Sequence, residues 1–401
     1  MGLVDIFYYN LACKKEKTED SLQLCEGGIN MKINDFQLER FFAKYEFKAP
    51  YLLSSSDCES FSVNEILEMA GDDTDMGDLW LGYTESLGDP ELRDEIVDLY
   101  QNISSDEVIV TAGAEEAIFV FMNVALEEDD HVICMFPAYQ SLFEIANSIG
   151  CEVSHWELKE ENGWEPDLNE LRDAIRPNTR AIIINTPHNP TGYLFSQEKL
   201  EEVIEVARKN DLYLFSDEVY KFLEHDEKDR LPSVCDHYEK GISLGVMSKS
   251  FGLAGLRIGW IATQDEELYR EFASFKDYTS ICNSAPSEYL AIRALQNKDK
   301  LVKRNLGIIE ENMELLDQFF EKYDDLFEWQ KPKAGSIAFP RLTIDEPIEE
   351  FCIKLVEETG VLLLPGNYYF AGDKNFRIGF GRKNMPEALS ILDDYLEKNY
   401  R

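Results

Sequence analysis

One lysine stands at the end of an apolar, strand-like stretch within residues 243–260. The stretch ends in Ser248-Lys249, continues through small and glycine residues, and has Arg257 eight positions after the lysine. A lysine at the end of a buried strand loses hydration, which lowers its pKa and makes a neutral amine available for Schiff-base chemistry. A lone Ser-Lys pair is more often part of a surface loop, so the rest of the chain must decide.

Other polar residues also follow predicted strands. Asn189 lies in Asn185-Thr-Pro-His-Asn-Pro-Thr-Gly192, and Asp217 and Tyr220 follow the apolar run 212–216. Strands at 152–156, 181–185, 212–216, 242–246 and 257–262 alternate with helical patterns at 168–175 and 198–209. This alternation predicts right-handed crossovers and a mainly parallel sheet, in which ligands bind at the carboxyl ends of the strands. We therefore expect these side chains to meet at one edge of the sheet.

A glycine turn joins a predicted strand to a predicted helix within residues 108–117. Gly113, Ala114 and Glu115 stand at the start of that helix. The free N–H groups and positive dipole end of a helix N-terminus suit a phosphate. Many α/β proteins contain such a junction, so the pattern alone does not identify a protein class.

Taken in order, these motifs resemble those of the fold-type I, class I/II aminotransferases, which carry pyridoxal phosphate (PLP), and the resemblance extends from Tyr51 to the C-terminus. It implies that Lys249 forms the Schiff base and then moves the α-proton of an amino acid, while Asp217 holds the pyridine nitrogen protonated. It also implies that Asn189 and Tyr220 contact the phenolic oxygen and that Tyr139, in Phe136-Pro-Ala-Tyr139, stacks on the ring.

The resemblance gives further residues a role at the phosphate and at the substrate. The strand Phe376-Arg-Ile-Gly-Phe-Gly-Arg382 matches the one whose arginine grips the α-carboxylate, so Arg377 takes that role beside Asn189. Arg382 should face the other way if the strand continues. Val246 stands where the family often has a hydroxyl residue. Binding of the phosphate would therefore depend more on Ser248, on Arg257 and on the backbone at Gly113. The implied phosphate-binding residues are Gly113, Ala114, Glu115, Ser248, Arg257 and, from the neighbouring subunit of a homodimer, Tyr83.

The implied fold is α/β: the PLP-dependent transferase fold type I, with a mostly parallel seven-stranded sheet in a large domain and a small α+β domain. We predict the large domain at residues 76–290 and the small domain at 31–75 and 291–401. Residues 1–30 are expected to be an extension outside the catalytic core. Apolar residues at helical spacing predict a helix over 35–45. The segment 51–58 is either an ordinary loop or one that crosses the mouth of the active site.

Composition excludes several classes of partner and compartment. The chain has 401 residues, 44% of them hydrophobic, and a formal net charge of -39, which disfavours nucleic acid and anionic membrane surfaces. Its eight cysteines have no metal-ligand spacing, so we expect reduced thiols in a cytoplasmic protein and no metal site. No apolar run is long enough to span a bilayer, and the apolar residues 3–13 lack the basic start of a signal peptide.

The function expected from the resemblance is transfer of an amino group between an L-amino acid and a 2-keto acid. Parts of the chain, at 248–260 and 376–382, are also similar to capreomycidine synthase-like members, which carry out elimination and cyclisation on an arginine derivative. A PLP-binding regulator would carry a basic helix-turn-helix, which is not evident here. A catalytically dead homologue would lack the lysine or the aspartate, and Lys249 and Asp217 are both present.

Overall fold

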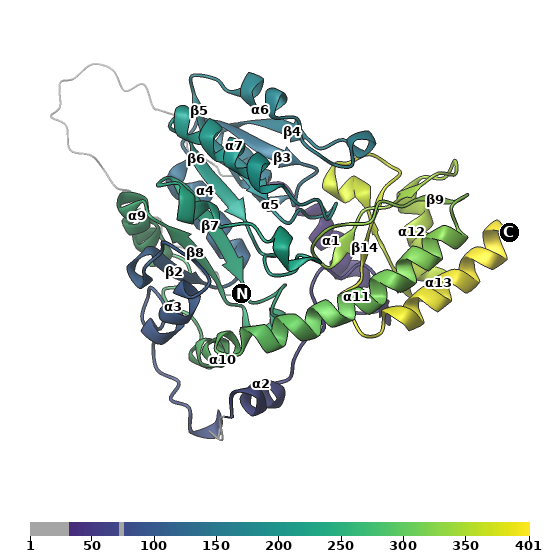
Figure 1. Ribbon diagram of the computed structural model, residues 1–401, viewed down its shortest axis with the longest axis horizontal. Coiled ribbons are helices and arrows are strands. Elements are labelled where there is room, and N and C mark those ends of the chain that lie inside the picture. Colours follow the sequence, from purple (N-terminus) through teal and green to yellow (C-terminus); the bar gives the residue numbers. More distant parts are fainter. Residues whose placement is uncertain (1–31, 72–75) are drawn as a thin grey trace, which may run out of the picture. The chain divides into compact units, whose positions relative to one another are not determined.

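The computed structural model describes residues 32–71 and 76–401. Ile33–Arg401 form one compact unit, which holds a seven-stranded sheet and, among the described residues, three smaller sheets (Figure 1). The extension predicted at residues 1–30 lies outside the described part of the chain. The boundaries of the two domains stay predictions.

The seven-stranded sheet has the order β2-β8-β7-β6-β5-β3-β4. Strand β8 runs antiparallel to both of its neighbours, and the other four pairs are parallel. The predicted α/β fold with a mostly parallel sheet is therefore confirmed. The strands are β2 (Val108–Thr111), β3 (His131–Phe136), β4 (Glu152–Glu157), β5 (Thr179–Asn185), β6 (Tyr213–Asp217), β7 (Gly241–Val246) and β8 (Gly259–Thr263).

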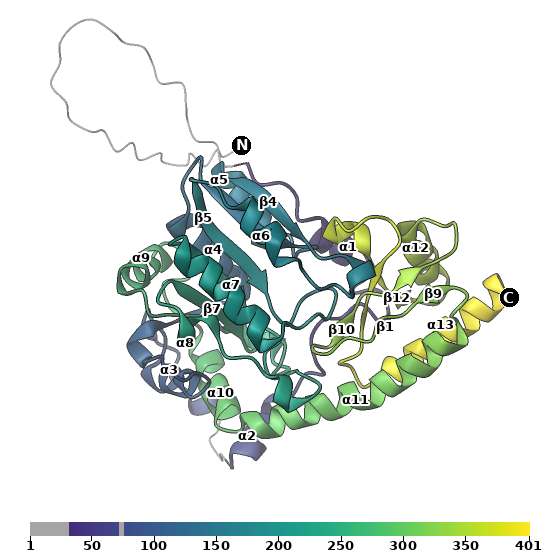
Figure 2. The same cartoon turned by 45° about the horizontal axis from the view of Figure 1, so that its top comes forward.

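Both faces of this sheet are buried, which explains the continuous apolar runs of its strands. Ile183 packs into the core on one face, whereas Ile182 and Ile184 pack into the core on the other. Figure 2 shows α6 and α7 in front of the sheet, with α4 and α5 behind it. One face is covered by α4 (Ala114–Ala125), α5 (Ser141–Ile149) and α9 (Glu266–Lys276), and the other by α6 (Leu168–Ala174), α7 (Gln197–Lys209) and α8 (Val234–His237).

A third apolar cluster covers the β2 edge of the sheet. It contains Val108 and Val110 of β2, Trp260 of β8, and side chains from several helices. The Trp260 indole N–H donates to the Tyr100 hydroxyl at 2.7 Å, so this edge is fixed by a hydrogen bond as well as by packing. These helices include α2 (Val63–Ala70), α3 (Pro90–Val97) and α10 (Ala285–Leu295).

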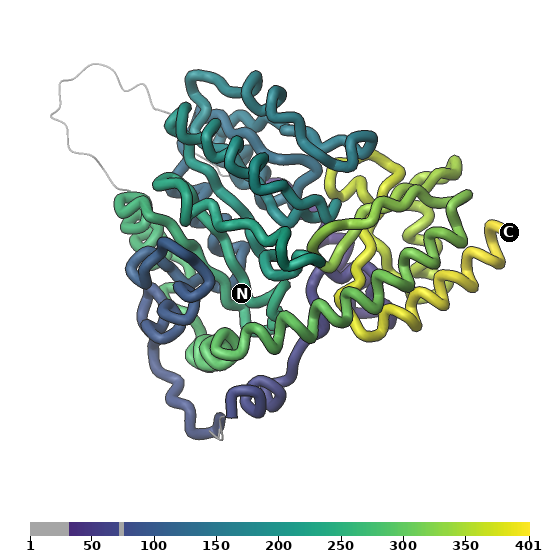
Figure 3. Tube along the Cα trace, in the orientation of Figure 1, coloured from purple at the N-terminus to yellow at the C-terminus, as the bar shows by residue number. Residues whose placement is uncertain are grey.

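Segments from the early and late parts of the described chain pack together. Strand β1 (Tyr51–Leu52) pairs in parallel with β12 (Val361–Leu362), and Figure 3 shows the early purple segment running among the late yellow-green ones. Helix α11, 25 residues long, packs beside α13. The other elements of this region are α1 (Gln37–Tyr45), α11 (Lys298–Lys322), α12 (Ile348–Thr359), α13 (Met385–Tyr400), β9 (Phe327–Glu328), β10 (Ile337–Ala338), β11 (Arg341–Leu342), β13 (Leu364–Pro365) and β14 (Phe376–Gly379).

Two further observations concern the expectations drawn from composition. The six cysteines in the described part of the chain are free thiols, five of them buried. Across residues 32–71 and 76–401, every helix is too short or too polar to traverse a lipid bilayer.

Candidate active site

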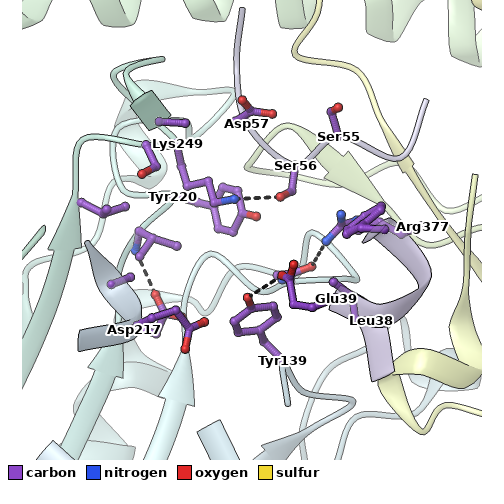
Figure 4. Close-up of a pocket in the computed structure, with 18 of the residues that line it drawn as sticks. Leu38, Glu39, Ser55, Ser56, Asp57, Tyr139, Asp217, Tyr220, Lys249 and Arg377 are labelled. Carbon is purple, nitrogen blue, oxygen red and sulfur yellow. Dashed lines mark hydrogen bonds between the residues drawn. The ribbon is translucent and has the colours of Figure 1, made fainter. Parts of the chain in front are cut away.

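A cavity of about 460 Å³ lies at the carboxyl ends of β5, β6 and β7, where the sequence predicts a site. Figure 4 shows side chains converging on it from the sheet and from the segments near both chain ends. Ten of the predicted site residues line it: Ala114, Glu115, Tyr139, Asn189, Asp217, Tyr220, Ser248, Lys249, Arg257 and Arg377.

Lys249 follows β7 by three residues and extends its amine into the cavity. Its Nζ donates a hydrogen bond to Oγ of Ser56 at 2.8 Å (Figure 4). Burial lowers the pKa of Lys249, because the charged ammonium loses water, and the carboxylates of Asp57 and Asp217 oppose that shift. The predicted desolvated lysine is therefore present, next to a hydroxyl that fixes its direction.

Asp217 is the last residue of β6 and is only 6% exposed. The backbone N–H of Val219 donates to its Oδ1 at 3.2 Å. Burial raises the pKa of Asp217 to about 7, although the Val219 amide and Lys249 both favour the ionised form. A buried carboxyl with so little compensation is suited to a cationic partner such as a protonated ring nitrogen.

Asn189 is held by a chain of amide contacts at the strand ends. Its backbone N–H donates to Oδ1 of Asn185 at 2.6 Å, and Nδ2 of Asn185 donates to the carbonyl of Asp217 at 2.9 Å. The Tyr369 hydroxyl donates to Oδ1 of Asn189 at 3.0 Å. Because its side-chain oxygen is occupied, Asn189 has its amide N–H₂ group left to donate to a ligand.

Arg377 enters from β14 and is 2% exposed. Its Nε and Nη2 donate to the carbonyl of Ser54 at 3.2 and 2.7 Å. Its Nη1 donates to the Tyr369 hydroxyl and, at 3.3 Å, to Oδ1 of Asn189. These neutral acceptors fix the guanidinium without cancelling its charge, so it can still attract a carboxylate.

The phosphate end predicted at the start of α4 is a close approach between Gly113 and Arg257. Gly113 has a φ of 87°, and a Cβ placed on it would lie 2.6 Å from Nη2 of Arg257. Only glycine leaves the room that the guanidinium occupies. Ser248 is 7% exposed beside this end, and Val246 lines the cavity without offering a hydroxyl.

Three predicted residues make their contacts differently from the simplest expectation. The carboxylate of Glu115 accepts from the Ser141 hydroxyl at 3.3 Å, and burial raises its pKa. The Tyr139 hydroxyl donates to Oε1 of Glu39 at 3.3 Å. The Tyr220 side chain is 1% exposed, and its hydroxyl has no hydrogen-bond partner among the described residues.

Tyr83 is not part of this cavity. It is 87% exposed and borders a separate shallow hollow together with residues 282–286. One chain alone therefore does not place Tyr83 at the site, and its expected action across a dimer interface stays a prediction.

Several cavity residues were not predicted as site residues. Glu39 and Glu46 come from α1 and its C-terminal end, and Ser55, Ser56 and Asp57 come from the segment 51–58. That segment therefore borders the active-site cavity, one of the two alternatives that the sequence leaves open.

Arg382 also lines the cavity, together with Arg377, so the expectation that it faces the other way is wrong. Strand β14 ends at Gly379, so the alternation that would turn Arg382 away does not reach it. Its Nη2 donates to both oxygens of Asp57, at 2.7 and 2.9 Å.

The residues present fit PLP on three independent observations. The Tyr220 hydroxyl is a buried polar group without a partner. The Gly113–Arg257 contact leaves a cradle at a helix N-terminus that a Cβ would fill. Asp217 is a buried carboxyl that a pyridinium N–H would compensate.

Comparisons with known proteins agree with this geometry. The family model for aminotransferase class I and II matches residues 50–392. A capreomycidine synthase from Streptomyces vinaceus is 28% identical over 369 residues, which cover 91% of this chain and 94% of that protein. A probable aspartate aminotransferase from Methanocaldococcus jannaschii is 27% identical over 366 residues, which cover 86% of this chain and 95% of that protein.

Solved structures give the same family. A PLP-dependent aminotransferase from Streptococcus suis superposes with a TM-score of 0.87 at 33% identity, covering 92% of this chain and 99% of that one. The PLP-dependent cyclase OrfR superposes with a TM-score of 0.84 at 27% identity, covering 92% and 98%. The chain therefore belongs to the class I and II aminotransferase family and, like that family, takes pyridoxal phosphate as its cofactor.

Proposed function

We propose that this family member transfers an amino group between an L-amino acid and a 2-keto acid, with Lys249 as the covalent attachment point of PLP. The observation that carries the proposal is the convergence of Lys249, Asp217, Asn189 and Arg377 on one cavity. When bound, PLP supplies an electron sink for the carbanion formed at the α-carbon of the substrate.

Lys249 is proposed as the group that takes and returns the α-proton. Its lowered pKa leaves more of the neutral amine near neutral pH, which a general base requires. Ser56 accepts a hydrogen bond from Nζ and so holds the amine in the cavity while it is not covalently engaged. Ser56 is therefore a positioning residue for the proton transfer.

Asp217, Asn189 and Tyr220 are proposed to bind the cofactor ring. The Asp217 carboxylate would keep the ring nitrogen protonated, which makes the ring a better electron acceptor. The Asn189 amide and the unpartnered Tyr220 hydroxyl would donate to the phenolic oxygen. Tyr139 would stack on the ring, with its hydroxyl held by Glu39.

We propose that two further cations bind the anionic groups: Arg257 binds the phosphate, and Arg377 binds the substrate carboxylate. The backbone at Gly113, Ala114 and Glu115, together with Ser248 and Arg257, would hold the phosphate. The Arg377 guanidinium would bind the α-carboxylate and fix which face of the substrate meets Lys249.

We also propose a cytoplasmic homodimer, in which Tyr83 reaches the phosphate of the neighbouring subunit. The exposure of Tyr83 and of nearby Trp80 and Leu81, at 87%, 78% and 76%, supports a covered position in an assembly. The free cysteines support a reducing compartment.

An elimination or cyclisation reaction is the alternative, favoured by the similarity to a capreomycidine synthase and to the cyclase OrfR. Both reactions begin with the same loss of the α-proton, so Lys249, Asp217 and Arg377 do not separate them. The fate of the amino nitrogen does. An aminotransferase must pass it to a keto acid, whereas a cyclase keeps it in its own product.

The experiment follows that nitrogen. The purified holoenzyme is incubated with a panel of ¹⁵N-amino-labelled L-amino acids, with and without 2-oxoglutarate, and the products are analysed by mass spectrometry. We expect ¹⁵N-glutamate only when 2-oxoglutarate is present. Without it, the matching keto acid should not exceed one equivalent per active site, and Lys249→Ala should give neither product. Many turnovers without any keto acid, with ¹⁵N retained in the product, would replace transfer by the alternative.

A further inference from the structure

The cations of the cavity are already engaged when the α-carboxylate is bound. Arg257 lies at the phosphate end, Lys249 is the covalent attachment point, and Arg377 is assigned to the α-carboxylate. Arg382 is paired with Asp57 at 2.7 Å. Among the described residues, no further cation lines the cavity, so a second carboxylate on the substrate would find no unengaged positive partner there.

Two carboxylates on the α1 side of the cavity are in the opposite situation. Glu39 and Glu46 both line it, and neither forms an ion pair with a lysine, arginine or histidine within residues 32–71 and 76–401. Burial and the neighbouring Glu39 carboxylate raise the pKa of Glu46, although Arg377 and Arg382 act against that shift. This wall of the cavity therefore carries two carboxyl groups that no ion pair within the described residues compensates.

Glu39 is the better placed of the two to contact a substrate. Figure 4 shows its carboxylate extending from α1 into the space between Tyr139 and Arg377. Tyr139 donates to Oε1 at 3.3 Å, which is a long hydrogen bond and leaves most of the acceptor capacity of the carboxylate unused. The buried Tyr220 hydroxyl, proposed above to contact the cofactor, lines the same cavity, so Glu39 belongs to a cavity in which a ligand completes the hydrogen bonding.

We propose that Glu39 selects substrates whose side chain carries a positive charge, a guanidinium or an ammonium group, at the end opposite to the α-carboxylate. This inference rests on the proposed function, which assigns the α-carboxylate to Arg377. A molecule held at Arg377 by its carboxylate and at Glu39 by its cation has both charges compensated. A neutral or acidic side chain leaves Glu39 without a cation or sets two carboxylates against each other.

The test uses acids that lack the α-amino group and therefore cannot take part in α-amino-group transfer. The absorbance of the cofactor is followed in each titration, because the primary amine of 5-aminopentanoate could itself condense with PLP. 5-Guanidinopentanoate, 5-aminopentanoate and the neutral 5-ureidopentanoate are titrated into the holoenzyme by calorimetry. We expect at least one of the two cationic acids to bind about tenfold or more tightly than the ureido acid, which is the usual gain of a charge-assisted hydrogen bond over a neutral one. In Glu39→Gln, which keeps the shape and an acceptor for Tyr139, we expect that preference to fall below about threefold.

The control variant is Glu68→Gln, which removes one carboxylate at an exposed position of α2 outside the cavity and should retain the preference. Thermal unfolding of each holoenzyme checks that the variants are folded. Equal binding of the cationic and neutral acids to the wild type, or an unchanged preference in Glu39→Gln, would overturn the inference. Because no probe has an α-amino group, the binding test does not depend on nitrogen transfer. A preference for the cationic acids that is lost in Glu39→Gln, together with failed nitrogen transfer, would reject only the proposed reaction. Successful nitrogen transfer without that preference would reject only the role of Glu39.

Discussion

Replacing Asp217 with asparagine tests the electrostatics of the site without requiring catalysis. In the cofactor-free protein, burial moves the pKa of Asp217 from an ordinary 3.8 to about 7. The folded protein therefore binds this proton more tightly than the unfolded chain does. The resulting stabilisation is complete below about pH 4 and is lost as the pH rises through about 7.

The size of the effect follows from the two pKa values. At about 1.4 kcal/mol for each pKa unit, ionising the buried carboxyl costs the folded state about 4 kcal/mol in total. Between pH 5 and pH 8 the loss is about 2.5 kcal/mol. Asparagine does not titrate, so the free energy of unfolding of the wild type should fall by that amount relative to Asp217→Asn over the same interval.

The measurement is urea unfolding of both cofactor-free proteins at pH 5, 6, 7 and 8, at one protein concentration. Asp173→Asn, which changes an exposed carboxylate on α6, controls for general charge effects. PLP added at pH 8 should then stabilise the wild type more than Asp217→Asn, because only the carboxylate gains a cationic partner. A wild-type-minus-variant difference that stays constant within about 0.5 kcal/mol would refute the assigned burial cost.

Three further predictions concern the cofactor, the substrate carboxylate and the dimer. Borohydride reduction and peptide mapping should find the pyridoxyl group on Lys249 alone, and label on another lysine would contradict the assignment. Arg377→Lys should raise the KM of the amino donor about tenfold or more with a smaller change in kcat, because an ammonium group lacks the planar fork of a guanidinium. Steady-state kinetics at full PLP content measure both constants, and an unchanged KM would count against the role of Arg377. Mixing inactive Lys249→Ala with inactive Tyr83→Ala should restore some activity if subunits exchange, whereas no recovery despite proven exchange excludes a shared site.

The strands of the large sheet and the site residues at its edge were predictable, because the sequence patterns that indicate them lie within short segments of the chain. Runs such as Ile182–Ile184 between turn-forming residues predict buried strands, and the chemistry-bearing residues follow those strands directly. Asn189, Asp217 and Lys249 therefore had to gather at one edge once the strands were parallel. The pairing partners and the antiparallel direction of β8 carry no comparable local signal.

The opposite wall of the cavity was not predictable, because it depends on contacts between distant segments. The helix at 35–45 was predicted from its apolar spacing, yet that spacing does not say which of its polar residues faces a ligand. Glu39 becomes a cavity residue only because α1 is placed against the sheet edge. Arg382 joins it because β14 stops at Gly379, and a single strand end decides on which side that arginine lies.

The pairing of β1 with β12 sets an order of events during translation. The strands of the seven-stranded sheet all lie between residues 108 and 263, so the ribosome delivers that sheet long before residues 361–362 exist. Until then the buried apolar side chains of α1 lack their late partners. Phe41, for example, packs against Tyr368 of η6 (Gly366–Tyr369), with the ring centroids 4.9 Å apart. A nascent chain stalled before β12 would thus display an assembled sheet beside an unsatisfied apolar helix, which is the kind of surface that chaperones bind and proteases attack.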